Sequence, residues 1–203
     1  ATVIEQYQLP VYLFADLLTA FEQDITVKRY QSYEQIHQYC RHSADPVGRI
    51  LLHLYQELRP DSLRMSDAIC TGLQLTNFWQ DVAIDWEKDR VYLPLDALNA
   101  HQLDESYIQR RCQQQPTTSQ QDLQWQQLMQ EQVRYARSLL EQGKPLVQRL
   151  PGRIGLELKM IILGGLRILE RLDQVQYDVF TARPKLGKAD WLRLGGRLLF
   201  TRF

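Results

Sequence analysis

The chain has 203 residues, of which 44% are hydrophobic and 24% are charged. This balance favours one folded domain with a sizeable core and excludes collagen-like and intrinsically disordered classes. The formal net charge is zero, but residues 1–100 contain 14 acids and 8 bases, while residues 101–203 contain 10 acids and 16 bases. The composition disfavours nucleic acid as a partner and leaves room for a basic surface near the C-terminus.

Cysteine usage and the N-terminal residues indicate a compartment. Cys40, Cys70 and Cys112 are too widely spaced to form a zinc-binding pattern or a disulfide framework, which favours a reducing environment. The first ten residues lack the basic and apolar regions of a signal peptide. No uncharged apolar run reaches the roughly 18 residues that a membrane span needs. We therefore expect a cytoplasmic protein.

Apolar periodicity predicts helices throughout and no strands. Pro10 should open a first helix, in which apolar residues over 11–21 share one face. Ser32 and Gln35 have capping-box spacing at the start of a second helix, which Asp45-Pro46 should break before it resumes. An extended loop and four further helices are then predicted, the loop over 88–94 and the helices over 66–86, 103–114, 120–142 and 155–174.

Two features mark the C-terminal part of the chain. Gly164-Gly165 lies inside a helical pattern and indicates close packing against a neighbouring helix. The segment 185–203 carries five bases and one acid among apolar residues. Such a basic amphipathic segment can lie on an anionic membrane surface, here that of the inner membrane. It can equally be a terminal helix packed on the bundle with its charges in solvent, and the pattern leaves both interpretations open.

The chemically informative pattern lies on the helix predicted over 66–86. At about 100° per residue, Gln74, Asn77, Asp81 and Asp85 form one polar stripe about 80° wide. Two buried, unpaired carboxylates one turn apart are costly, and a divalent cation removes that cost. Mg²⁺ binds through one or two carboxylates together with substrate phosphates. The stripe is therefore either half of a Mg²⁺–diphosphate site or a solvated face whose acids pair with arginines on a neighbouring helix.

Two longer segments resemble a known family. The run QLTNFWQDVAIDWEKDRVYLP over 74–94 resembles the second aspartate-rich motif of the squalene/phytoene synthases, and YCRHSADPVGR over 39–49 resembles their other signature. Together with GGLRILE over 164–170 and YDVF over 177–180, these motifs are most similar to the hydroxysqualene-forming branch of the hopanoid pathway. The resemblance implies an all-α bundle with a central cavity, like the class I isoprenoid synthases.

The resemblance also implies the domain organisation. Residues 1–203 would form a single domain that is the C-terminal part of a longer enzyme, because the first aspartate-rich motif of the family would precede residue 1. Without that motif the chain would be inactive on its own, and it would expose an apolar wall of the cavity.

The same resemblance assigns a metal site. Asp81 and Asp85 would ligate Mg²⁺ that holds the substrate diphosphate, with Asn77 as a further metal ligand. Gln74 and Asn77 would support the diphosphate, and Arg90 would contact it directly as an always-charged fork donor.

Other residues are implied to line the hydrocarbon part of the site. Tyr39 would lie near the reacting carbons, where its ring can stabilise a carbocation and its hydroxyl can relay a proton. Ser43 and Gly48 would leave room for a prenyl chain, although small residues also serve plain helix packing. Arg183 would meet phosphate. Gln80 departs from the arginine that many members carry before the first aspartate, which would weaken diphosphate binding on this side.

The implied reaction converts presqualene diphosphate and water into hydroxysqualene and diphosphate. No nicotinamide-binding pattern occurs, which argues against reduction to squalene. One alternative is the head-to-head condensation of two farnesyl or geranylgeranyl diphosphates. Another is a non-catalytic helical assembly factor of the same fold. The expected partners are a prenyl diphosphate, Mg²⁺, a membrane surface contacted through 185–203, and other enzymes of the squalene pathway.

Overall fold

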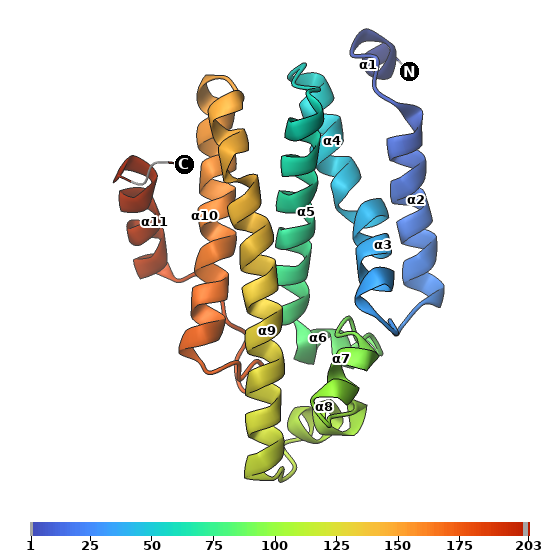
Figure 1. Ribbon diagram of the computed structural model, residues 1–203, viewed down its shortest axis with the longest axis vertical. Helices are drawn as coiled ribbons and strands as arrows, with labels where there is room; N and C mark the ends of the chain where they lie inside the picture. Colours follow the sequence, from blue (N-terminus) through green and yellow to red (C-terminus); the bar gives the residue numbers. More distant parts are fainter. Residues whose placement is uncertain (1, 201–202) are drawn as a thin grey trace.

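The computed structural model describes residues 2–200 and residue 203, without the side chains of residues 2 and 199. Every regular element in this part of the chain is a helix (Figure 1), which confirms the predicted all-α class. In chain order the helices are α1 (Thr2–Gln6), α2 (Val11–Thr26), α3 (Tyr33–Ser43), α4 (Asp45–Leu54), α5 (Pro60–Gln80), α6 (Val82–Glu87), α7 (Leu95–Ala100), α8 (Glu105–Cys112), α9 (Ser119–Gly143), the 3₁₀ helix η1 (Lys144–Arg149), α10 (Gly152–Gln174) and α11 (Lys188–Phe200).

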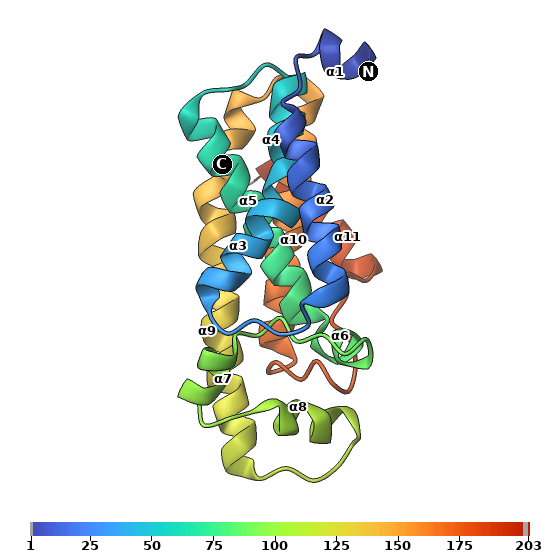
Figure 2. The same ribbon diagram turned by 90° about the vertical axis from the view of Figure 1, so that its right-hand side faces the viewer.

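Helices α5 and α9 form the centre of the bundle. They lie side by side along most of their length, with α2, α3 and α4 on one side and α10 and α11 on the other (Figures 1 and 2). Large side chains from both helices are fully buried between these layers, and each contributes about 1.5–3 kcal/mol by leaving water. They include Leu75, Trp79, Leu128, Met129 and Leu140. This packing fixes the rotation of α5 and therefore the direction of its polar stripe.

The first predicted helix forms, but its apolar face points the other way. Helix α2 follows Pro10 as expected, yet Leu13 and Ala20 are the residues that face the core. Val11 and Phe21, which belong to the apolar face predicted over 11–21, are exposed. Helix α2 is apolar on two sides, and periodicity alone does not tell which side is covered. The outward side carries exposed apolar side chains.

The start of the second helix differs from the predicted capping box. Ser32 occupies the N-cap position of α3, but its side chain caps no backbone N–H. Instead, the side-chain oxygen of Gln35 accepts a hydrogen bond of 2.7 Å from the backbone N–H of Gln31. The predicted interruption is confirmed: Ala44 leaves helical geometry between α3 and α4, and Pro46 lies in the first turn of α4.

The helix predicted over 66–86 is wrong at both ends. Helix α5 begins at Pro60, where proline needs no backbone donor, and stops at Gln80. Asp81 has φ −107° and ψ 13°, and α6 follows it as a separate short helix. Backbone hydrogen bonds still run from Asp81 to Asn77 (2.9 Å) and from Asp85 to Asp81 (2.8 Å). The chain therefore keeps a helical path through the break, and the polar stripe continues across it.

The other predicted elements agree with the structure to within a few residues, but three short helices were not predicted. The extended loop before Pro94 is present, and an isolated parallel bridge joins Arg29 to Val91 inside it. The helices without a prediction are α1, α7 and η1, whose five or six residues are too short for a periodic signal. It also missed the capping box of α9, in which Thr118 and Gln121 exchange hydrogen bonds.

A buried acid lies directly after the α3–α4 break. Asp45 is shielded from solvent and accepts a hydrogen bond of 2.9 Å from the hydroxyl of Thr71 on α5. Burial raises the pKa of Asp45 to about 7, and the nearby carboxylate of Asp67 adds to the shift. This carboxyl therefore changes charge in the folded protein near neutral pH.

The titration of Asp45 should make stability depend on pH. Its raised pKa means that the folded state holds this proton more tightly than the unfolded chain, so stability is lost as the pH rises from about 4 to about 7. Relative to Asp45→Asn, the wild-type free energy of unfolding should fall by about 2–3 kcal/mol between pH 5 and pH 8 in urea titrations. Asp96→Asn, which alters an exposed acid, is the control. Parallel profiles for wild type and Asp45→Asn would contradict the prediction.

Candidate active site

The acidic end of α5 is held by an arginine from a distant segment. The guanidinium of Arg183 donates two hydrogen bonds to the carboxylate of Asp81, one of them 3.1 Å long from Nη2. Only 14% of the Asp81 side chain is exposed, against 40% for Arg183. This contact raises the pKa of Arg183, although burial acts against it. Arginine pairing of the stripe is therefore observed, but the arginine comes from the loop after α10 and not from a neighbouring helix.

Asp85 lacks a comparable partner. Its side chain is 13% exposed, and the Nζ atom of Lys88 lies 3.9 Å away. Burial raises the pKa of Asp85 to about 6; Lys88 opposes the shift, and the negative charge of Asp81 one turn away adds to it. The two carboxylates thus share one closely bound arginine. An additional cation here would be favourable because it would offset both the burial and the mutual repulsion.

The donor set fits Mg²⁺ that keeps some of its own ligands. Among the described residues there is no cluster of three or more His, Cys, Asp or Glu side chains able to enclose a metal. Asp81 and Asp85 provide carboxylate oxygens, and the exposed Asn77 lies on the same side of α5. Mg²⁺ typically uses one or two protein carboxylates and takes its remaining ligands from water and phosphate. These residues therefore fit such an ion, and their metal roles stay predictions.

A second polar cluster surrounds Asp24, which the sequence analysis missed. The Tyr39 hydroxyl donates to Asp24 Oδ1 at 2.8 Å, and Arg90 Nη2 donates to the Asp24 backbone carbonyl at 3.1 Å. Arg90 also lines a small hollow together with Asp85 and Tyr92. One signal could have pointed to Asp24, because it lies in the last turn of α2, where the helix dipole disfavours an acid.

The environment of Tyr39 is aromatic and dry. Its ring lies within 6.1 Å, centroid to centroid, of Tyr30, Phe78 and Tyr92, and the last two are stacked 3.8 Å apart. Burial raises the pKa of Tyr39, and the hydrogen bond to Asp24 adds to the shift. The phenol is therefore held in its neutral, donating form beside Arg90. Its proposed part in catalysis stays a prediction.

The small residues of the first motif have different surroundings. An added Cβ on Gly48 would lie 2.3 Å from Ser66 Oγ and 2.6 Å from Cys70 Sγ, so this glycine permits close approach of α4 and α5. Gly48 also lines a cavity, and its role in leaving room for a prenyl chain stays a prediction. Ser43 is half-buried and its Oγ has no hydrogen-bond partner. Gln74, also half-buried, lies outside the linings of the two cavities described next.

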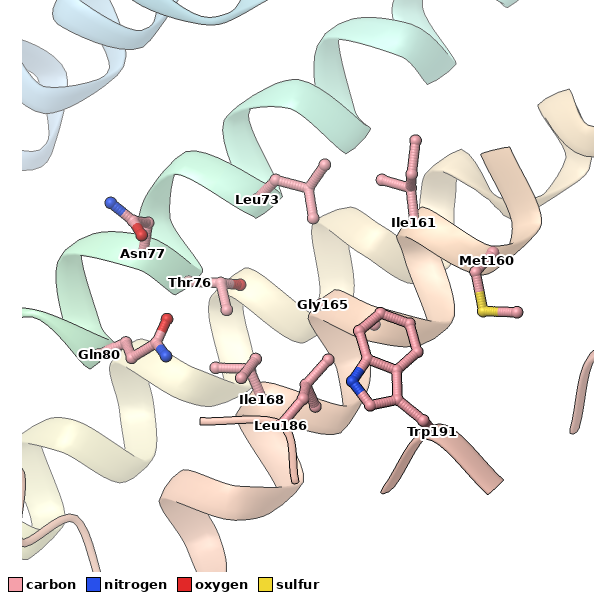
Figure 3. A pocket seen from close by; sticks show the side chains of 11 residues that line it. Leu73, Thr76, Asn77, Gln80, Met160, Ile161, Gly165, Ile168, Leu186 and Trp191 are labelled. Atoms are coloured by element: carbon pink, nitrogen blue, oxygen red, sulfur yellow. The ribbon is translucent and has the colours of Figure 1, made fainter. Parts of the chain in front are cut away.

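Two apolar cavities follow α5 away from its acidic end. One of about 300 Å³ lies between α5, α10 and the start of α11, and one of about 390 Å³ lies between α4, α5, η1 and α10. They share Leu73 and Ile161, so they adjoin. In Figure 3 the polar side chains of Asn77 and Gln80 lie at one end of the first cavity. That end is one residue from Asp81. Volumes of this size are typical of small-molecule sites.

The segment between α10 and α11 crosses the first cavity, and we call residues 183–191 the C-terminal strap. The pair of Arg183 and Asp81 ties down its beginning, and the buried Gln80 donates from Nε2 to the carbonyl of Pro184. Its end is tied by Asp190, which is fully buried and accepts from Arg167 and Arg171 at 2.7 Å each. Gln80, which stands where many members of the resembled family have arginine, therefore serves to hold the strap.

This fold and site define an all-helical protein with an acidic stripe at the mouth of an apolar cavity. The squalene/phytoene synthase family matches residues 1–190, and the chain belongs to this family. Solved structures agree. Squalene synthase HpnC from Alicyclobacillus acidocaldarius has a TM-score of 0.78 and 32% identity, covering 86% of this chain and 63% of that one. A dehydrosqualene synthase in complex with ligand has a TM-score of 0.83 at 19% identity, covering 97% and 67%.

The similar curated proteins include both hydroxysqualene synthases and phytoene synthases. Hydroxysqualene synthase of Rhodopseudomonas palustris is 46% identical over 86 residues, which is 42% of this chain and 29% of the relative. Chloroplastic phytoene synthase of Daucus carota is 26% identical over 196 residues, which is 93% of this chain and 47% of the relative. These curated relatives are matched over 29% to 59% of their own length.

The two glycines of the predicted pair on α10 have different surroundings. An added Cβ on Gly165 would lie 2.8 Å from Leu73 and 3.1 Å from Leu140, which confirms close helix packing there. An added Cβ on Gly164 would meet no atom within 4 Å, because this residue faces the cavity of about 300 Å³. A glycine inside a helix costs up to about 1 kcal/mol relative to alanine. Packing therefore explains Gly165 and does not explain Gly164.

Alanine substitutions on α10 should separate these situations. Gly164→Ala is expected to raise the free energy of unfolding by about 0.5–1 kcal/mol, because it gains helix propensity without a clash. Gly155→Ala, in the same helix, should lower it by about 1–3 kcal/mol, because the new Cβ would lie 2.7 Å from the Val147 carbonyl oxygen. Denaturant titrations of both variants check the pair. A destabilised Gly164→Ala would mean that the space beside this residue is filled.

Proposed function

We propose that this chain supplies the second aspartate-rich wall of a prenyl diphosphate site and acts in hydroxysqualene formation. The observation that carries the proposal is the position of Asp81 and Asp85, one helical turn apart, directly after the residues Asn77 and Gln80 that form the polar end of an apolar cavity. A hydrocarbon chain with a diphosphate at one end has the matching polarity. The identity of 41–46% to hydroxysqualene synthases over about half of the chain favours this branch.

In the proposed site Asp81, Asp85 and Asn77 would hold Mg²⁺, which would supply electrostatic stabilisation to the leaving diphosphate. Arg183 would be the residue that changes partner. It pairs with Asp81 in the structure, and it would contact the diphosphate when substrate is bound. Arginine suits both roles because its planar fork binds carboxylate and phosphate in the same bidentate manner. Arg90, next to Asp85, adds a second positive charge.

The aromatic cluster around Tyr39 would protect the cationic hydrocarbon that remains after diphosphate leaves. Tyr39, Phe78 and Tyr92 pack against one another in buried surroundings that exclude bulk water, and aromatic rings of this kind stabilise a nearby cation. The water that forms the alcohol product would have to be admitted singly. We propose the neutral Tyr39 hydroxyl, fixed by Asp24, as the group that orients it.

Head-to-head condensation of two farnesyl or geranylgeranyl diphosphates is the second candidate. The match to phytoene synthases over 93% of the chain favours it, although at lower identity. A non-catalytic assembly factor is the third candidate. It has no need of an under-compensated carboxylate beside an apolar cavity, so the surroundings of Asp85 weigh against it.

Product analysis of the complete enzyme tests the proposal. Incubation with presqualene diphosphate and Mg²⁺ should yield hydroxysqualene, and Asp81→Ala should lower kcat at least about 10²-fold by removing a metal ligand. Asp89→Ala is the matched control, since this exposed acid pairs with Arg29 outside the site. Unchanged turnover in Asp81→Ala would contradict the catalytic role. Presqualene diphosphate, dehydrosqualene or phytoene formed from farnesyl or geranylgeranyl diphosphate, without hydroxysqualene, would favour the condensation reaction.

We also propose that α11 contacts an anionic membrane surface. No helix among the described residues is long and apolar enough to cross a bilayer. Leu192 and Phe200 are 81% and 86% exposed on α11, and the exposed bases Lys188 and Arg193 accompany them. Exposed apolar side chains flanked by bases suit the interface of an anionic bilayer. The buried Asp190 and Leu194 show that the opposite side of the same helix packs on the bundle.

Vesicle co-sedimentation tests the membrane contact. The protein should bind vesicles containing phosphatidylglycerol, and binding should fall with added salt because part of the attraction is electrostatic. Replacing Leu192 and Phe200 by serine should reduce the bound fraction at least about fivefold, because it removes the apolar contact. Leu123→Ser, on exposed α9 surface, is the control. Equal binding of wild type and the double variant would contradict the proposal.

A further inference from the structure

Gly164 leaves a space that the protein itself does not use. It lies in the interior of α10, and a Cβ there would meet no atom within 4 Å. The space belongs to the cavity of about 300 Å³, whose walls are largely apolar. Because neither a turn nor close packing requires glycine at this position, the empty volume itself is the feature that glycine provides.

Trp191 forms the opposite wall of the same cavity. Figure 3 shows its indole beside Gly165, with Met160 and Ile161 near the same end. The side chain is 56% exposed, a high value for tryptophan. The backbone beside it is held in place, because the preceding residue is the fully buried Asp190, which accepts hydrogen bonds from two arginines and from the backbone N–H of Gly187. A large apolar side chain thus stands on a fixed backbone with much of its surface uncovered.

The two ends of the cavity differ in polarity. Asn77 and Gln80 lie at the end next to Asp81, whereas Met160, Ile161 and Trp191 lie at the other end (Figure 3). A ligand with its charged group at Asp81 would therefore extend its hydrocarbon part along α10, past Gly164, toward the indole. Asn77 and Gln80, which precede Asp81 in the chain, give this cavity one polar end and otherwise largely apolar walls, and an isoprenoid chain with a diphosphate at one end has the same polarity.

We propose that Gly164 and Trp191 are specificity-determining residues that set how much isoprenoid chain this cavity accepts. Gly164 provides the width through which the chain passes, and Trp191 closes the far end and covers the terminal isoprene unit. This inference rests on the proposed function, since it takes the prenyl diphosphate as the ligand. It adds the two residues that select the chain and predicts that chain selection is independent of the metal.

Binding of farnesol, which carries the hydrocarbon chain without the diphosphate, tests the role of Gly164. Calorimetric titration should show at least about tenfold weaker binding to Gly164→Leu, with Gly164→Ala intermediate, because the added side chains occupy the cavity. Gly196→Leu is the matched control: it also lies in a helix, and an added Cβ there also meets no atom within 4 Å, but it is outside the cavity. No binding to wild type, or equal binding to wild type and Gly164→Leu, would overturn the inference.

The role of Trp191 is tested by comparing farnesol with the longer geranylgeraniol. Trp191→Ala should shift the ratio of their affinities at least about fivefold toward geranylgeraniol, because it opens the far end of the cavity. Leu123→Ala should leave the ratio unchanged. An unchanged ratio in Trp191→Ala would overturn the assignment.

These probes need neither Mg²⁺ nor Asp81, so the two proposals can fail separately. Gly164-dependent farnesol binding in an enzyme that forms no hydroxysqualene would leave this inference standing and refute the proposed reaction. Hydroxysqualene formation together with farnesol binding that does not depend on Gly164 would leave the proposed reaction standing and refute this inference.

Discussion

The ion pair between Asp81 and Arg183 is the contact on which the site is organised. Asp81, at the end of α5, and Asp85, on α6, lie where little of either side chain reaches solvent, and like charges one turn apart repel each other there. Arg183, which lies 102 residues further along the chain, donates hydrogen bonds to Asp81. Burial raises the pKa of Asp85, and the charge of Asp81 adds to the shift although Lys88 opposes it. A further cation at this place would offset both effects.

The same ion pair links the charge of Asp81 to the position of the C-terminal strap. Because Arg183 begins the C-terminal strap, the state of Asp81 is linked to the segment that covers the apolar cavity. Gln80 holds the next residue of the strap, and Asp190 fixes its far end on α10. The strap is thus tied at both ends and bears Trp191 against the cavity. If a cation displaced Arg183, the ion pair with Asp81 would be lost, but Asp190 would still hold the far end of the strap. Any movement would therefore be confined to the beginning of the strap.

The sequence predicts the helical class, most helix boundaries and the acidic stripe, because each depends on local periodicity. It could not predict the break at Asp81, since the backbone there departs only slightly from helical geometry and keeps its hydrogen bonds. Nor could it predict which side of α2 is buried, which depends on tertiary packing. The pair of Asp81 and Arg183 has no local signature at all. Asp24 had only a weak one, as an acid at an unfavourable helix end.

We propose that a divalent cation would take the place of Arg183 at Asp81 when prenyl diphosphate binds. Crystals of the complete enzyme with farnesyl thiodiphosphate and Mn²⁺ would test this directly through anomalous scattering. We predict a metal peak beside Asp81 and Asp85, with Arg183 turned from Asp81 to the diphosphate. A bound diphosphate with no metal peak at this pair, and with Arg183 still on Asp81, would contradict the account.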